Sequence, residues 1–178
     1  MGSKKTSKKM SVEEEYQKMT PHEHILALPD TYIKSVEPDT QDMYIFDSDK
    51  KMIVKKEITY IPGLYKIFDE IVVNARDQSI RDKKCNVIKA YFDKKLGKIT
   101  IWNNGNGIPV EMHKKEKMYV PEMIFGNLLT SSNYNTKGKT VGGKNGYGAK
   151  LANIYSTSFD IETVDKKKKL LYKQHFYD

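Results

Sequence analysis

The strongest periodic pattern of apolar residues in this chain follows a Pro-Gly pair that starts at Pro62. Apolar side chains recur there at intervals of three and four residues, which is the spacing of one face of an α-helix. They are Leu64, Phe68, Ile71 and Ala75. Proline is favoured as the first residue of a helix, where its missing N–H costs no hydrogen bond. The pattern therefore predicts a helix over residues 63–81 with a stripe that faces the core.

Shorter segments predict the remaining elements. Runs in which apolar and polar residues alternate between turn-forming residues are typical of strands paired in hairpins. These runs lie at residues 43–46, 53–60, 87–93, 98–102, 159–164 and 170–176. Further helices are predicted at residues 121–129 and 149–155, with a short one at residues 13–19. Three prolines interrupt residues 20–49, so turns and extended chain are expected there.

This order of elements predicts an α+β fold, in which helices pack on a β-sheet as a two-layer sandwich. Hairpin connections favour an antiparallel sheet, and a mixed sheet fits the same pattern. Residues 1–14 contain four lysines and few apolar groups, so we expect a basic flexible arm there. Residues 15–178 are expected to form one folded domain.

Composition narrows the class of protein. The chain has 178 residues, of which 38% are hydrophobic, so it has room for one domain with a core. Its formal net charge of +8 suits a polyanionic partner, although charge alone does not separate nucleic-acid binding from general solubility. The single cysteine, Cys85, allows no intrachain disulfide, so we expect a reducing compartment. No apolar run reaches the length of a membrane span, so no membrane partner is expected.

A glycine-rich loop between Val141 and Leu151 is the first candidate site. Glycines let backbone N–H groups approach an anion, so the loop predicts a cradle for a polyphosphate, although a flexible surface hinge has the same composition. The loop is not a P-loop, because Asn133 stands where the first glycine would be. Its glycines and lysines are Gly142, Gly143, Lys144, Gly146, Gly148 and Lys150.

A second stripe on the predicted long helix is polar. Glu70, Asn74, Asp77 and Arg81 recur on it at helical spacing. Such stripes are usually solvated faces. A carboxylate one turn away from a carboxamide can instead supply a general base and an oxygen ligand for Mg²⁺.

Two loops add further polar groups. Asn103 ends a predicted strand before a glycine-rich turn, so it either belongs to an ordinary Asn-Gly turn or hydrogen-bonds the edge of a base. Residues 130–134 carry hydroxyl and amide groups after a predicted helix. They either cap that helix or contact a ribose and its phosphates.

In chain order, a Glu-x-x-x-Asn helix, an x-Asn-Gly-x-Gly turn and a Gly-x-Gly loop resemble the GHKL ATP-binding fold. Gyrase, the heat-shock chaperone of ninety kilodaltons, histidine kinases and the MutL repair proteins share this fold. Residues 68–75, 101–109, 128–134 and 142–151, with a strap at residues 16–33, are most similar to the ATPase segment of eukaryotic-type DNA topoisomerase II. That resemblance implies an enzyme that uses ATP to close a dimer gate and pass one DNA duplex through a double-strand break.

The resemblance also implies roles for single residues. Glu70 would activate the water that attacks the γ-phosphate of ATP, and Asn74 would bind Mg²⁺. Asn103 would read adenine, Asp77 would belong to the nucleotide site, and Tyr16 would reach across a homodimer to the partner's nucleotide. The residues that would contact the sugar and the phosphates are Ser131, Ser132, Asn133, Asn145, Gly146, Tyr147, Gly148, Ala149 and Lys150.

Two features depart from the family pattern. Gln78 stands where asparagine is usual, which keeps an amide for ligand binding, and Arg76 stands where alanine is usual. The resemblance also places Asp178 inside the sheet of the ATPase fold, so we expect a C-terminally incomplete domain without the transducer and the cleavage core. Slow or absent ATP hydrolysis is therefore expected of this chain alone.

The resemblance further implies partners and a location. Double-stranded DNA would be the substrate of the full enzyme, a homodimer would form through the N-terminal strap, and the protein would be nuclear. A viral origin would place it in the nucleus or the cytoplasm of the host cell. Two alternatives are another GHKL ATPase, of the chaperone or mismatch-repair type, and a non-catalytic DNA-binding or dimerisation fragment.

Overall fold

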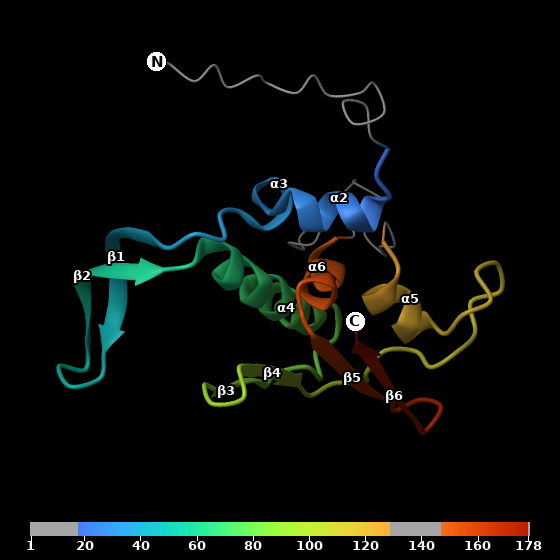
Figure 1. The fold of residues 1–178 in the computed structure, drawn as a ribbon. Coiled ribbons are helices and arrows are strands. Elements are labelled where there is room, and N and C mark those ends of the chain that lie inside the picture. The colour runs from blue at the N-terminus through green and yellow to red at the C-terminus, as the bar shows by residue number, and fades with distance from the viewer. Residues whose placement is uncertain (1–17, 129–146, 178) are drawn as a thin grey trace, which may run out of the picture.

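The computed structural model describes residues 18–128 and 147–177. In chain order its elements are α2 (Pro21–Ala27), α3 (Pro29–Ile33), β1 (Asp39–Asp47), β2 (Met52–Tyr60), α4 (Pro62–Arg81), β3 (Ile88–Asp93), β4 (Lys98–Asn103), α5 (Val120–Gly126), α6 (Gly148–Ile154), β5 (Ser158–Asp165) and β6 (Leu170–Tyr177). In Figure 1, α2 and α3 lie on one side of α4 and α6, and the hairpins β3–β4 and β5–β6 lie on the other side. The β1–β2 hairpin projects away from this body.

The predicted long helix is confirmed as α4. It begins at Pro62 and ends at Arg81, as the sequence pattern indicates. Its buried face differs from the predicted stripe, because Asp77 is 1% exposed whereas Leu64 is 55% exposed. The reason is that α4 packs against α3, α6 and β4 at once, so burial follows these contacts and not a single apolar stripe.

The shorter predicted elements are also present, with shifted ends. The helix expected at residues 121–129 is α5, which ends at Gly126, and the helix expected at residues 149–155 is α6. All six predicted strands form, and β1 is longer than expected, since it begins at Asp39. The short helix predicted at residues 13–19 falls almost entirely outside the described residues.

The stretch that was predicted to be turns and extended chain is partly helical. The Thr20 hydroxyl accepts a hydrogen bond from the Glu23 N–H at 3.2 Å, and the Glu23 carboxylate accepts one from the Thr20 N–H at 2.8 Å. This reciprocal cap stabilises the start of α2, and Pro21 and Pro29 are the first residues of α2 and α3. The prediction was wrong because it treated these prolines only as helix breakers.

The described strands pair as three separate antiparallel hairpins, β1–β2, β3–β4 and β5–β6. The α+β class is confirmed. Within residues 18–128 and 147–177 these strands do not join into the single mixed sheet that we expected. Each strand finds its hydrogen-bond partner across a short turn, and the chain between β4 and β5 forms α5 and α6.

The three hairpin turns share one local design. In each turn an aspartate accepts hydrogen bonds from two backbone N–H groups of the same turn, and the residue four positions later adopts a left-handed backbone. This conformation suits glycine, which has no Cβ to clash with the backbone. The aspartates are Asp47, Asp93 and Asp165, and the left-handed residues are Lys51, Gly97 and Lys169.

The best-buried apolar cluster joins the first two helices to α6. Ile25 of α2, Ile33 of α3 and Leu151 of α6 are each at most 4% exposed. The Tyr155 hydroxyl, just after α6, donates a hydrogen bond to the Ile25 carbonyl. The N-terminal helices therefore fix the helix that follows the glycine-rich loop.

Two expectations concern the limits of the described chain. The predicted boundary between the basic arm and the folded domain, at residue 14, lies outside the described residues. None of the helices within residues 18–128 and 147–177 combines the length and the apolar character that crossing a bilayer requires.

Candidate functional site

A cavity of about 2350 Å³ lies between α4, β4, α6 and β5. Its lining includes residues from three separate parts of the chain, namely Glu70 and Asn74 of α4, Asn103 at the end of β4, and residues 147–150 at the start of α6. The structure therefore brings together the Glu-x-x-x-Asn helix, the Asn-Gly turn and the described part of the glycine-rich loop. A pocket with a few converging polar groups is the usual form of a ligand site.

Glu70 lies on α4 between a lysine and the first residue of α6. Lys66 precedes Glu70 by one helical turn, and its Nζ is 2.5 Å from Glu70 Oε1. The hydrogen bond with Glu70 is the main reason why the pKa of Lys66 is raised. On the other side, a Cβ on Gly148 would overlap Glu70 Oε2. The Glu70 carboxylate therefore occupies space that is open only because residue 148 is glycine.

Asn74 follows Glu70 by one turn. Its side-chain Nδ2 donates a hydrogen bond of 2.8 Å to the Glu70 carbonyl oxygen, which fixes the orientation of the carboxamide. Within the described residues, no group of three His, Cys, Asp or Glu side chains is placed to hold a metal ion. Mg²⁺ at a triphosphate usually takes one or two protein ligands and completes its shell with phosphates and waters. An amide oxygen on Asn74 fits that requirement.

Asn103 is the last residue of β4. Its Nδ2 donates to the carbonyl of Asn104 at 2.9 Å and lies 3.5 Å from the sulfur of the buried Cys85. The turn that follows contains Gly105 and Gly107, with φ of 125° and 76°. These values belong to the region that favours glycine, so the turn conformation depends on both residues.

Residues 147–150 bring one lysine into the cavity wall. Lys150 is 4% exposed, and this burial lowers its pKa to about 8. The ring of Tyr147 lies 6.1 Å from that of Tyr32 in α3. A buried ammonium of this kind is a natural site for an anion, because a bound negative charge offsets the cost of burying it.

Of the other predicted site residues, the structure describes Asp77 alone. Asp77 is buried on α4 with Arg76 Nη1 at 3.6 Å, and it is not among the residues that line the cavity. Its role at a nucleotide therefore stays a prediction. The remaining predicted residues lie outside the described part of the chain, namely Tyr16, Ser131, Ser132, Asn133, Asn145 and Gly146.

Sequence reasoning missed three charged residues around the site. Lys66 could have been found, because it lies one turn before Glu70 and opposite charges at that spacing pair on a helix. Asp82 and Asp165 accept hydrogen bonds from the turn after β4, through the backbone N–H groups of Asn106 and Val110. No local pattern pointed to Asp165, because its partner is 55 residues away in the chain.

Comparison with known proteins identifies the family. The family model described as "Histidine kinase-, DNA gyrase B-, and HSP90-like ATPase" matches residues 59–169, which is more than half of the chain. This chain belongs to that ATPase family. The match contains the described residues of all three motifs, so the cavity between α4, β4 and α6 is the candidate ATP site of this ATPase chain.

The curated proteins that are similar in sequence include DNA topoisomerases 2. DNA topoisomerase 2-beta of Gallus gallus is 60% identical over 170 residues, which cover 95% of this chain and 10% of that protein. DNA topoisomerase 2 of Acanthamoeba polyphaga mimivirus is 55% identical over 179 residues, which cover 98% of this chain and 14% of that protein. This ATPase chain thus spans a small part of the curated relatives it matches.

Two crystal structures have the same fold over nearly all of the chain. The ATPase and transducer domains of DNA topoisomerase II from Balamuthia mandrillaris match with a TM-score of 0.92 and 51% identity, covering 95% of this chain and 43% of that one. The ATPase region of Saccharomyces cerevisiae topoisomerase II matches with a TM-score of 0.92 and 48% identity, covering 94% and 45%.

Proposed function

We propose that this chain is the ATP-binding segment of a type II DNA topoisomerase. The observation that carries the proposal is the convergence of Glu70, Asn74, Asn103 and Lys150 on one cavity in a chain of the ATPase family. The high identity to DNA topoisomerase 2 proteins supports the choice of this branch over chaperone or repair ATPases.

In the proposed reaction, a water molecule attacks the γ-phosphorus of ATP and the bond to the bridging oxygen of ADP breaks. The Glu70 carboxylate accepts the proton of the attacking water. Lys150 and the backbone of residues 147–149 bind the phosphates, and Asn103 hydrogen-bonds adenine. Mg²⁺, bound to Asn74 and the phosphates, would neutralise phosphate charge. Because phosphoryl transfer depends mainly on positioning and on charge stabilisation, this set of residues suits it.

For the whole protein, we propose that ATP binding and hydrolysis drive the closure of a dimer gate and the passage of one DNA duplex through a double-strand break. Tyr16 and the rest of the N-terminal strap would join two copies across the gate. The nucleus is the proposed location, with the host nucleus or cytoplasm as the location for a viral protein.

The site is tested by calorimetric titration of this chain with a non-hydrolysable ATP analogue, with and without Mg²⁺. Asn74→Ala is expected to bind at least about tenfold more weakly in Mg²⁺ and to lose the difference between the two conditions. Gln41→Ala, on the projecting β1–β2 hairpin, is the matched control and should bind like the unchanged chain. Circular dichroism verifies that each variant folds.

Either of two results would contradict the proposal. One is a folded chain that does not bind the analogue, and the other is Mg²⁺-dependent binding that survives Asn74→Ala. The chain alone is expected to hydrolyse ATP slowly or not at all. Turnover at the rate of an intact topoisomerase ATPase region would contradict this second expectation.

A further inference from the structure

The turn between β4 and α5 forms part of the cavity wall. Its residues 104–110, called the base turn below, directly follow Asn103, and Gly105, Gly107, Ile108 and Pro109 line the cavity. The base turn has no regular secondary structure of its own. Its conformation must therefore be fixed by hydrogen bonds to its neighbours.

The end of α4 fixes one side of the base turn. Asp82, the residue that caps α4 at its C-terminus, accepts hydrogen bonds from the Asn106 backbone N–H at 2.7 Å and from Asn106 Nδ2 at 3.1 Å. The Asn106 backbone bond is the main reason why the pKa of Asp82 is lowered. This contact connects the base turn to the helix that carries Glu70 and Asn74.

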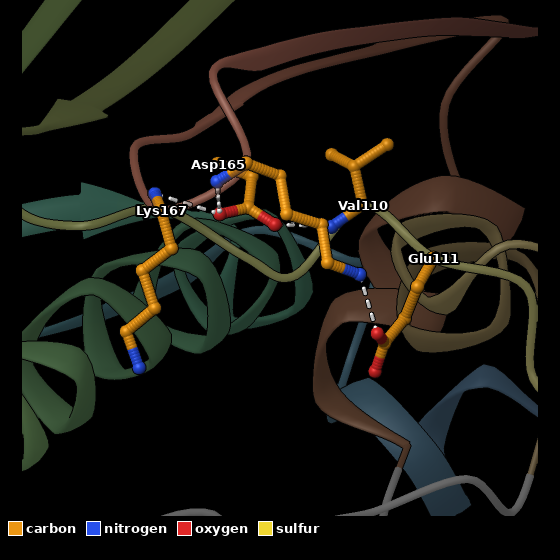
Figure 2. Close-up of polar contacts among 5 residues, drawn as sticks. Val110, Glu111, Asp165 and Lys167 are labelled. Atoms are coloured by element: carbon orange, nitrogen blue, oxygen red, sulfur yellow. Dashed lines mark hydrogen bonds and ion pairs between the residues drawn. The ribbon is translucent and has the colours of Figure 1, made fainter.

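The β5–β6 hairpin fixes the other side. Asp165 Oδ2 accepts a hydrogen bond of 3.0 Å from the Val110 N–H, and Thr163 Oγ1 accepts one of 3.0 Å from the Ile108 N–H. A Cβ on Gly107 would overlap the Val164 carbonyl oxygen, so the two backbones are in close contact. Figure 2 shows the Asp165 carboxylate between its own turn and Val110.

Asp165 differs from the equivalent aspartates of the other two hairpins. All three accept hydrogen bonds from two N–H groups of their own turn. Within the described residues, only Asp165 also accepts one from a distant loop, through its second oxygen. Asp165 is 4% exposed, and the Val110 N–H is the main reason why its pKa is lowered. The distant bond is thus an addition to an ordinary turn aspartate.

We propose that Asp165 is a positioning residue for recognition of the nucleotide base. It holds the base turn against the β5–β6 hairpin and so keeps Asn103 where it contacts adenine. The inference rests on the proposed function, in which Asn103 is the residue that binds the base. Thr163 supports the same turn through Ile108, and its contribution is smaller because it provides one neutral hydrogen bond.

The test compares affinities of variants for an ATP analogue, the matching GTP analogue and inorganic triphosphate. Asp165→Ala is expected to reduce the preference for the ATP analogue over the GTP analogue about fivefold, since a charged hydrogen bond is lost, while triphosphate affinity stays unchanged. Asp93→Ala removes the same local turn contacts without touching the base turn, and it is expected to keep the full preference. If Asp165→Ala does not fold, the isosteric Thr163→Val takes its place in the test. It is expected to reduce the preference for the ATP analogue over the GTP analogue about twofold.

The outcomes separate this inference from the proposed function. If Asn103→Ala leaves the adenine preference intact, the assignment of Asn103 in the proposed function is wrong. If Asn103→Ala removes the preference while Asp165→Ala and Thr163→Val keep it, the inference is overturned. An equal loss in Asp93→Ala would also overturn it, because the effect would then come from general weakening of a hairpin turn.

Discussion

At the scale of single residues, Lys150 links burial to ligand binding. Its pKa is lowered to about 8 from the usual 10.5, because burial disfavours the charged ammonium. Between these two values the unfolded chain keeps the proton that the folded chain has lost. Stability of the ligand-free protein therefore rises as the pH increases from about 8 towards 10.5. Burial favours the neutral form of Lys150, whereas a bound polyphosphate favours the charged form.

We therefore predict that binding of the ATP analogue at pH 8 takes up about half a proton, because about half of the Lys150 side chains are neutral before binding. Calorimetry in two buffers of different ionisation enthalpy measures this uptake. Lys150→Met should abolish it, and Lys56→Met, on the projecting hairpin, should leave it unchanged. Binding without any proton uptake by the unchanged chain would contradict the prediction.

The contact between Glu70 and Gly148 gives a second residue-level prediction. Gly148→Ala should lower the free energy of unfolding by about 1–3 kcal/mol, because the new Cβ overlaps the Glu70 carboxylate. In a Glu70→Ala background the same change should cost clearly less, since the overlapping oxygen is gone. Urea unfolding of the four proteins forms a double-mutant cycle. Equal costs in both backgrounds would mean that Gly148 is constrained by something other than Glu70.

At the scale of elements, the three hairpins use the same turn with different residues at the left-handed position. Glycine occupies it in β3–β4, and lysine occupies it in β1–β2 and β5–β6. A left-handed backbone costs a residue with a Cβ about 1–2 kcal/mol, whereas glycine adopts it freely. The two lysine turns therefore carry local strain that the surrounding strand pairs offset.

We predict that Lys169→Gly raises the free energy of unfolding by about 0.5–1 kcal/mol, because relief of this strain exceeds the extra chain entropy of glycine. Lys167→Gly is the control in the same turn, since Lys167 is not left-handed, and it should give no gain. Gly97→Ala should cost about 1 kcal/mol for the converse reason. Chemical denaturation measures all three, and a stabilising Lys167→Gly would argue against left-handed strain as the cause.

The elements themselves were largely predictable from the sequence. Helix α4 and the strands were found because periodicity and turn residues act within a few positions of the chain. The Thr20–Glu23 cap of α2 is equally local, since its two residues are three positions apart and Pro21 follows Thr20 as the first residue of the helix. The separation of the strands into three hairpins was not predictable in this way, because joining hairpins into a sheet depends on contacts between distant segments.

At the scale of the whole molecule, α2 and α3 form one packing unit with α6. Ile25, Ile33 and Leu151 form its centre, and Tyr147, which precedes α6, packs against this cluster. The start of α6 lines the candidate ATP site. The N-terminal helices therefore help to fix the wall of the site.

We predict that Ile25→Ala lowers the free energy of unfolding by about 2–5 kcal/mol, since Ile25 is 1% exposed and its loss leaves a cavity. The neighbouring Leu26 is 47% exposed, so Leu26→Ala should change stability by less than about 0.5 kcal/mol. Urea unfolding compares the two. Similar effects in both variants would mean that α2 does not pack on α6 as described.

Local patterns in the sequence specify α4, α5, α6 and the hairpins. They also specify the chain order of Glu70, Asn74, Asn103 and the glycine-rich loop, from which the ATPase family follows. These features depend on neighbouring residues and on the chemistry that each residue type can perform. Packing between distant segments, by contrast, places Glu70 against Gly148, buries Asp77 outside the cavity lining, and brings Asp165 to Val110, 55 residues away. Such contacts depend on how whole elements pack, and no local pattern encodes that packing.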